Sequence, residues 1–180
     1  MRDELPKYLP FILTKITPDS FNKNPCKYYK KGYNFIIDDE YCEDAEIGKY
    51  LYHITIKEYL KDIKKYGLKP SKSDVIEDNI KNPPKNFKAV YLALSPDDSY
   101  EANPLLTMSK DIVVLRIEAN NIKNKLYLDP ENPPTEYKDA SLFFIYLGII
   151  KPELIEYASR IKFEGANLYA NNWKKLKEVK

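Results

Sequence analysis

Hydrophobic and polar positions along the chain predict one clear strand-to-helix unit near residue 50. Residues 50–54 form a short apolar run of strand length. Residues 55–58 then read Thr-Ile-Lys-Glu, which matches the capping box of a helix start. Apolar residues recur at spacings of three and four in the next turns, and we expect this stripe to face the core: Ile56, Tyr59, Leu60, Ile63 and Tyr66. Gly67 is the expected end of the helix.

The second half of the chain is dominated by predicted strands. Apolar runs favour strands at residues 89–94, 111–118, 126–128 and 141–148. Residues 71–88 carry charges and a proline pair without a sustained apolar period, which is typical of a long loop. We expect residues 160–180 to end in a short helix that carries Trp173 and Leu176. This order favours an α+β fold with a mixed or antiparallel sheet and flanking helices over a parallel β-α-β series.

Length and composition fit one folded unit. A chain of 180 residues with 43% hydrophobic and 31% charged residues is ordinary for a globular protein. Within it we expect an N-terminal extension packed on the core (residues 1–48), a central domain (49–160) and a C-terminal helical tail (161–180).

Charge and hydropathy set expectations about the surroundings of the protein. The chain has 29 basic and 27 acidic residues, and a net charge of +2 creates no whole-protein field that favours nucleic acid or a membrane. No window approaches the roughly 18 uninterrupted apolar residues of a spanning helix. The first residues are acidic and proline-rich, unlike a signal peptide. We therefore expect a soluble, cytoplasmic protein with no membrane contact.

Cysteine and histidine usage narrows the possible chemistry. Cys26 and Cys42 are too few for a disulfide scaffold and lack the spacing of a zinc site, so we expect two free thiols and no metal. His53 is the one histidine of the chain, which excludes mechanisms that need a histidine pair. Taken alone, a histidine in a strand is more often structural than functional.

The order of several short segments carries a family resemblance. Residues 51–55 read Leu-Tyr-His-Ile-Thr, a helix closes at Tyr-Gly-Leu-Lys-Pro, and residues 89–93 read Ala-Val-Tyr-Leu-Ala. In the back half, Leu-Tyr-Leu-Asp-Pro at 126–130 is followed by Tyr-Leu-Gly-Ile-Ile-Lys-Pro-Glu-Leu-Ile at 146–155. Together these segments resemble the ADP-ribosyltransferase superfamily, which includes RNA 2′-phosphotransferase and DNA-modifying toxin branches. The resemblance implies the split β-sandwich of that superfamily, with flanking helices.

The resemblance also implies NAD as a substrate and roles for matching residues. His53 would hydrogen-bond the nicotinamide-side ribose, Thr55 would support the end of that strand, and Tyr91 would stack on the nicotinamide, as in a His-Tyr-Glu arrangement. Arg116, which alternates with apolar neighbours, is a further candidate for ligand binding. Without the resemblance, Tyr91 would be taken for a core aromatic.

The sequence departs from this pattern where a catalytic carboxylate is expected. The glutamate position of the last strand falls at Phe143, which carries no charge to stabilise an oxocarbenium-like transition state. Glu136 on the preceding loop is the candidate replacement, with Glu131 and Asp139 as alternatives. The alternative interpretation of all three is a solvated loop acid.

The phosphotransferase branch is less favoured by the sequence, because that branch relies on several arginines and this chain has only Arg2, Arg116 and Arg160. Three functions stay open. The leading hypothesis is an NAD-consuming ADP-ribosyltransferase that modifies a macromolecular acceptor. The others are a catalytically inactive module that binds NAD, ADP-ribose or a nucleotide, and an interaction or inhibitor protein.

Overall fold

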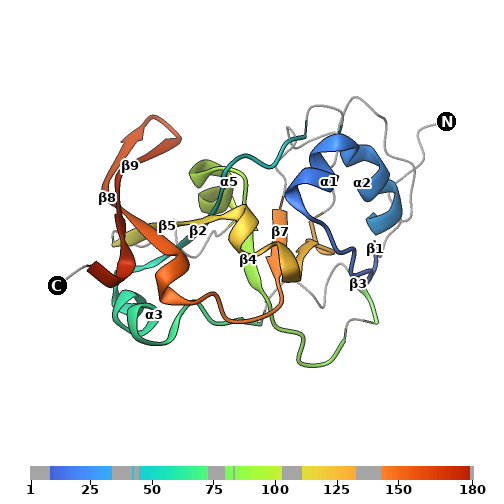
Figure 1. Cartoon of the computed structure of the whole chain (residues 1–180), viewed down its shortest axis with the longest axis horizontal. Helices are drawn as coiled ribbons and strands as arrows, with labels where there is room; N and C mark the ends of the chain where they lie inside the picture. Colours follow the sequence, from blue (N-terminus) through green and yellow to red (C-terminus); the bar gives the residue numbers. More distant parts are fainter. Residues whose placement is uncertain are drawn as a thin grey trace.

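The computed structural model describes residues 9–33, 42, 45–72, 80–82, 84–102, 111–132 and 143–178, and it confirms the α+β class. Seven strands form one antiparallel sheet in the order β6-β7-β4-β2-β5-β8-β9 (Figure 1). In that order the strands are Leu126–Leu128, Phe143–Tyr146, Val90–Ala93, Tyr50–Ile56, Ile112–Glu118, Ile155–Glu164 and Asn167–Lys175. The predicted strands at 89–94, 111–118, 126–128 and 141–148 are confirmed within the described residues.

Short helices flank this sheet. The α-helices are α1 (Pro18–Lys23), α2 (Pro25–Tyr33), α3 (Leu60–Tyr66) and α5 (Pro96–Glu101). Single 3-10 turns are η2 (Lys57–Tyr59), η3 (Ala119–Asn121), η4 (Lys123–Lys125), η5 (Pro152–Leu154) and η6 (Leu176–Glu178). Strands β1 (Leu9–Pro10) and β3 (Ile80–Lys81) pair separately in parallel. Helices α1 and α2 lie at one end of the molecule and the β8–β9 hairpin at the other (Figure 1).

The two faces of the sheet are buried in two separate clusters. Leu51, Leu92 and Leu115 belong to the larger cluster, which includes residues of α1, α2 and α3. Ile54 and Val114 belong to a smaller cluster that includes residues of β8 and β9. Because side chains alternate along a strand, odd-numbered residues of β2 face the larger cluster and even-numbered residues face the hairpin side.

The N-terminal helices pack on the sheet and are held by a disulfide. The ring of Phe21 in α1 lies edge-on to that of Phe144 in β7, with centroids 5.6 Å apart. Cys26 and Cys42 form a disulfide across a separation of 16 residues, with Cα atoms 5.1 Å apart. The prediction of two free thiols was therefore wrong. Cysteine spacing in the sequence carries no information on which backbone segments the fold brings together.

The strand-to-helix unit differs from its sequence prediction in one respect. Strand β2 continues through Thr55, which pairs with Val113 and is buried, so Thr55 caps no helix. A 3-10 turn follows, and α3 begins at Leu60. The seven paired residues between β2 and β5 outweigh the local capping preference. The helix ends at Gly67, as predicted, with φ at +84°.

The predicted C-terminal helix is wrong at Trp173, which lies in β9, and only Leu176–Glu178 form a 3-10 turn, η6. Residues 155–175 form the β8–β9 hairpin, which turns at Gly165 with φ at +63°. Trp173 pairs with Ala158 across the hairpin, and its ring centroid lies 6.0 Å from that of Tyr52. This cross-strand pairing is non-local, so a helical pattern in the tail could not reveal it.

Candidate functional site

The sheet opens at the seam between β2 and β4. The register there consists of one pair, Tyr52 with Ala93, whereas β2 and β5 share seven pairs. Continuing the register would pair Ile54 with Tyr91. Instead, the Ile54 amide donates to Ser99 Oγ at 3.1 Å, and His53 Nδ1 lies 2.8 Å from the Tyr91 carbonyl oxygen. Two side chains thus take the place of ladder hydrogen bonds.

This contact fixes the state of the His53 imidazole. A carbonyl oxygen can only accept, so the hydrogen-bond pattern assigns the proton to Nδ1 and leaves Nε2 as an acceptor. Burial lowers the pKa of His53, and the hydrogen bond to the Tyr91 carbonyl opposes that shift only in part. His53 is therefore neutral at pH 7, with one nitrogen held by the backbone and one left for a ligand.

His53 lines a cleft of about 380 Å³, a volume within the usual range for small-molecule sites. Its walls come from β2, from η2 and α3, from the segment that follows Gly67, and from the first residue of β4. The lining residues are His53, Thr55, Tyr59, Asp62, Ile63, Tyr66, Gly67, Leu68, Lys69, Ser71 and Val90.

One wall of the cleft is an aromatic and acidic stripe of the η2–α3 unit. Tyr59, Asp62 and Tyr66 are spaced three and four residues apart and all line the cleft. The sequence pattern predicted that Tyr59 and Tyr66 face the core, but they are 52% and 47% exposed. Lys69 Nζ lies 4.5 Å from the centroid of the Tyr66 ring. The rim therefore offers flat aromatic surfaces and a cation to a ligand.

A second wall is residues 67–71, and it is held at both ends. The backbones of Leu68 and Ile150 exchange hydrogen bonds of 2.9 and 3.0 Å, and those of Ser71 and Ala89 exchange bonds of 2.9 and 3.1 Å. A side chain at Gly67 would place Cβ 2.4 Å from the Ile150 carbonyl oxygen. Only glycine lets this segment approach Ile150 so closely.

The structure brings together only some of the residues that the sequence predicted for the site. His53 and Thr55 both line the cleft, but from β4 it is Val90, not Tyr91, that joins them. Tyr91 meets His53 through its backbone carbonyl, and its hydroxyl donates to Glu131 Oε1 at 2.9 Å. The side chain of Tyr91 is therefore not part of this cleft as the described residues form it.

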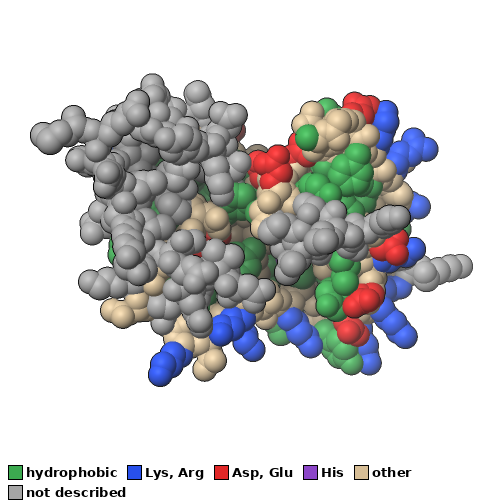
Figure 2. All heavy atoms as spheres, turned by 180° about the vertical axis from the view of Figure 1, so that it is seen from behind, with side chains coloured by type: hydrophobic (Ala, Val, Ile, Leu, Met, Phe, Trp, Pro, Cys, Tyr) green, Lys and Arg blue, Asp and Glu red, His purple; other side chains and the backbone are tan. Residues whose placement is uncertain are grey.

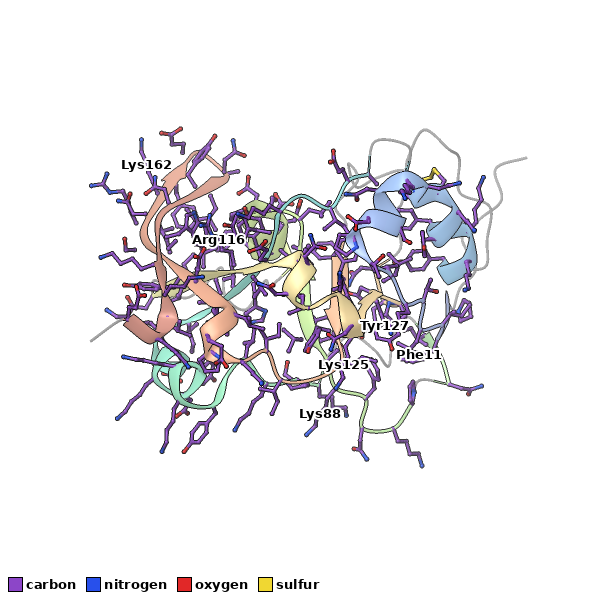
Figure 3. All side chains as sticks on the ribbon, viewed as in Figure 1. Phe11, Lys88, Arg116, Lys125, Tyr127 and Lys162 are labelled. Carbon is purple, nitrogen blue, oxygen red and sulfur yellow. A yellow bond between two sulfur atoms is a disulfide. The ribbon has the colours of Figure 1, made fainter. Side chains whose placement is uncertain are left out.

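Arg116 lies on the hairpin side of the sheet and is fully engaged there (Figure 3). Its guanidinium carbon is 3.9 Å from the centroid of the Tyr50 ring and 4.3 Å from that of Trp173. Its Nε donates to Glu156 Oε2 at 2.6 Å. Burial opposes ionisation of Glu156, but hydrogen bonds from Arg116 and Lys175 hold its pKa below the ordinary value. Arg116 stabilises the sheet here and does not reach the His53 cleft.

The carboxylate candidates fall in two groups. Glu136 and Asp139 lie outside the described residues. Glu131 is buried beside Tyr91, and its amide donates to Asp129 Oδ1 at 2.9 Å. Burial raises the pKa of Asp129 to about 7. Phe143 of β7 is buried and pairs with Ala93 of β4, so the position where a carboxylate was expected holds an apolar ring.

Within the described part of the chain, no helix is long and apolar enough to cross a membrane. The same residues contain no group of three or more histidine, cysteine or acidic side chains that could hold a metal ion.

Comparison with known proteins gives one informative relative. No family model matches the chain. The chain is 36% identical over 99 residues to a probable RNA 2′-phosphotransferase of Pyrococcus furiosus. The match covers 55% of this chain and 44% of that protein, so the chain spans less than half the length of the curated relative it matches.

This relative corrects the family inferred from the sequence. We expected a His-Tyr-Glu-like ADP-ribosyltransferase and ranked the phosphotransferase branch lower, but the similarity is to a protein named for phosphotransfer from RNA. In the cleft that the described residues form, the side chain of Tyr91 does not join that of His53. Seven of the described strands form one continuous sheet, β1 and β3 pair separately, and the features specific to the split sandwich are not shown.

Proposed function

We propose that this protein is an NAD-using transferase that acts on RNA carrying a 2′-phosphate. Similarity to a probable RNA 2′-phosphotransferase supports the RNA substrate, and NAD is the substrate that the resemblance of residues 51–155 implied. The proposal depends on one observation above all. His53 Nδ1 is fixed by the Tyr91 carbonyl at 2.8 Å, which leaves Nε2 as an acceptor at the cleft.

His53 and Thr55 give the cleft a nitrogen acceptor and a hydroxyl, groups that hydrogen-bond the hydroxyls of a ribose. In the proposed complex they orient the ribose whose bond to nicotinamide breaks. Positive charge develops on that ribose in the transition state, and a neutral imidazole adds no charge that would oppose it. Tyr59 and Tyr66 at the rim provide flat surfaces for an aromatic ring of the dinucleotide.

In the proposed reaction an oxygen of the 2′-phosphate bonds to the ribose carbon of NAD as the bond from that carbon to nicotinamide breaks. A hydroxyl of the same ribose then attacks the phosphorus, the bond from phosphorus to the RNA 2′-oxygen breaks, and that oxygen takes up the hydroxyl proton. The test is an incubation of the protein with NAD and an oligonucleotide that carries a single 2′-phosphate. Released nicotinamide and loss of phosphate from the RNA are measured together. We expect His53→Ala to lower both by about 100-fold, because the ribose loses its orienting contact.

Asn171→Ala provides the control, because Asn171 is an exposed residue of β9, away from the cleft lining. Circular dichroism and the melting temperature show whether each variant is folded. Unchanged turnover in a folded His53→Ala protein would contradict the proposed role of the cleft.

A second candidate function is an NAD-binding module without catalysis. Phe143 stands where the resemblance placed a carboxylate, and the arginines in the described residues lie away from the cleft, with Arg116 engaged by Glu156 and Arg160 in the hairpin. For this candidate NAD raises the melting temperature by mass action without release of nicotinamide. Titration with NAD, followed by both readouts, separates the two candidates.

A further inference from the structure

One lysine of the cleft lining and two lysines outside the cleft lie along the edge of the sheet on which the cleft opens. Lys69 belongs to the wall segment, and Lys88 precedes Ala89, which is hydrogen-bonded to Ser71 of that segment. Lys125 precedes β6, and its Nζ lies 3.6 Å from the position that a Cβ at Gly148 would occupy. Lys69, Lys88 and Lys125, which we call the lysine track, are all exposed.

The strand order explains why these lysines share one edge. Val90 of β4 pairs with Tyr146 of β7, and Tyr146 also pairs with Leu126 of β6. Lys88 and Lys125 therefore stand at the ends of strands that lie two positions apart in the sheet, a spacing of about 10 Å. Figure 3 shows both lysines in the lower half of the view, with Lys88 nearer the lower edge.

The lysine track differs from three lysines at the other end of the sheet. Lys162 is paired with Glu164, Lys175 with Glu156 and Lys177 with Glu153. Within the described residues, the three lysines of the track form no ion pair with a carboxylate. Seen from behind, blue side chains gather along the lower edge of the molecule (Figure 2). Within the described residues, this edge therefore presents lysines that have no carboxylate partner.

Aromatic side chains accompany the track at both ends. Tyr66, at the cleft, is 47% exposed with Lys69 over its ring. At the far end, Tyr127 is half-buried, and the rings of Phe11 and Phe87 pack edge-on with centroids 4.9 Å apart. Positive charge that follows a line, with aromatic rings beside it, is the arrangement that binds a single nucleic-acid strand through its phosphates and bases.

We infer that an RNA strand runs from the His53 cleft along the lysine track, with its phosphates at Lys69, Lys88 and Lys125. This inference rests on the proposed function, because it extends the path of the RNA whose 2′-phosphate enters the cleft. The partner is single-stranded RNA, since two strand ends and a wall segment offer a narrow line of contacts and no broad face.

The experiment measures fluorescence anisotropy of a short single-stranded RNA without a 2′-phosphate over a range of salt concentrations. The test variant is Lys88→Ala with Lys125→Ala. Its matched control is Lys162→Ala with Lys174→Ala, which removes the same charge from the exposed surface of the hairpin. We expect the test variant to bind at least about tenfold more weakly and to lower the salt slope by about 1.4, for two lost phosphate contacts. The control should bind like wild type.

Two results would overturn the lysine track as an RNA surface. One is equal weakening in the two double variants, which would mean that only net charge matters. The other is displacement of the bound RNA by a polyglutamate peptide as effectively as by unlabelled RNA, which would mean that the edge binds any polyanion. The NAD-dependent shift in melting temperature is measured in parallel. It should be the same in the test variant and wild type, so failure of the track and failure of the NAD proposal are distinguishable.

Discussion

The cleft at the β2–β4 seam and the β8–β9 hairpin lie on the same sheet, but they differ in whether their polar side chains have partners within the fold. On the hairpin side, the guanidinium of Arg116 lies over the rings of Tyr50 and Trp173. Arg116 also forms a salt bridge with Glu156, which forms a second one with Lys175. At the seam, His53 is held through one nitrogen, and the nearby lysine track has no carboxylate partners in the described residues. Groups that satisfy one another stabilise a fold, whereas groups left without partners can bind a ligand. This contrast is our reason to place function at the seam.

The largest expected effect is on the cleft wall, where Gly67→Ala should destabilise the protein far more than Gly165→Ala. At Gly67, φ is +84° and ψ is 174°, a region that is nearly glycine-only, and the new Cβ would meet the Ile150 oxygen at 2.4 Å. We expect a loss of about 3 kcal/mol or more from backbone strain and overpacking. At Gly165 φ is +63° but nothing lies within 4 Å, so the loss should be about 1 kcal/mol.

Urea unfolding of the two glycine variants measures these losses, and the NAD-dependent melting shift reports on the cleft. The Gly67 variant should also lose the NAD shift, because the wall moves. Equal losses of stability would mean that the close approach of residues 67–71 to Ile150 contributes little.

The next effect concerns the hairpin side, where Arg116→Ala should lower stability and leave the cleft intact. Removal of two ring contacts and a hydrogen bond to Glu156 should cost about 2–3 kcal/mol in urea unfolding. Arg116→Lys keeps the charge but not the planar stacking, so it should recover only part of the loss. Loss of NAD binding in a folded Arg116→Ala protein would contradict the contrast between the hairpin side and the cleft, because Arg116 would then have the ligand-binding role that the sequence suggested.

Sequence reasoning succeeded where local pattern decides the structure. Strands β4, β5, β6 and β7, the end of the helix at Gly67 and the antiparallel α+β class follow from apolar runs and glycine chemistry. The capping box at Thr55 and the helical tail failed, because pairing with β5 and the hairpin turn at Gly165 are non-local. The disulfide between Cys26 and Cys42 was missed for the same reason.

The site was predicted in part. Placing His53 and Thr55 at a ligand cleft remains a prediction about function, and both residues do line a cleft. Tyr91 and Arg116 were assigned to the same site, but strand alternation and the seam send their side chains elsewhere. Tyr59 and Tyr66 have helical spacing to Asp62, and that stripe could have suggested a cleft wall instead of a core face.

The smallest expected effect is the pH dependence that His53 contributes to stability. Its folded-state pKa is lowered from 6.5, chiefly by burial. As pH falls, the histidine of the unfolded chain therefore becomes protonated before that of the folded protein. The His53 contribution is therefore present above pH 6.5 and is lost as pH falls through the folded pKa. Asp129 acts in the opposite direction. Its folded pKa is raised from 3.8 to about 7, so its contribution is present below pH 3.8 and is lost as pH rises through 7.

Because these two titrations overlap, the difference in the free energy of unfolding between wild type and His53→Gln isolates the contribution of the histidine. Glutamine can donate to the Tyr91 carbonyl through its amide but does not titrate. Between pH 7 and pH 5 the free energy of unfolding of wild type should fall relative to that of the variant. Parallel curves over this range would mean that His53 accepts a proton as readily in the folded protein as in the unfolded chain. The lowering of the His53 pKa by burial would then be wrong.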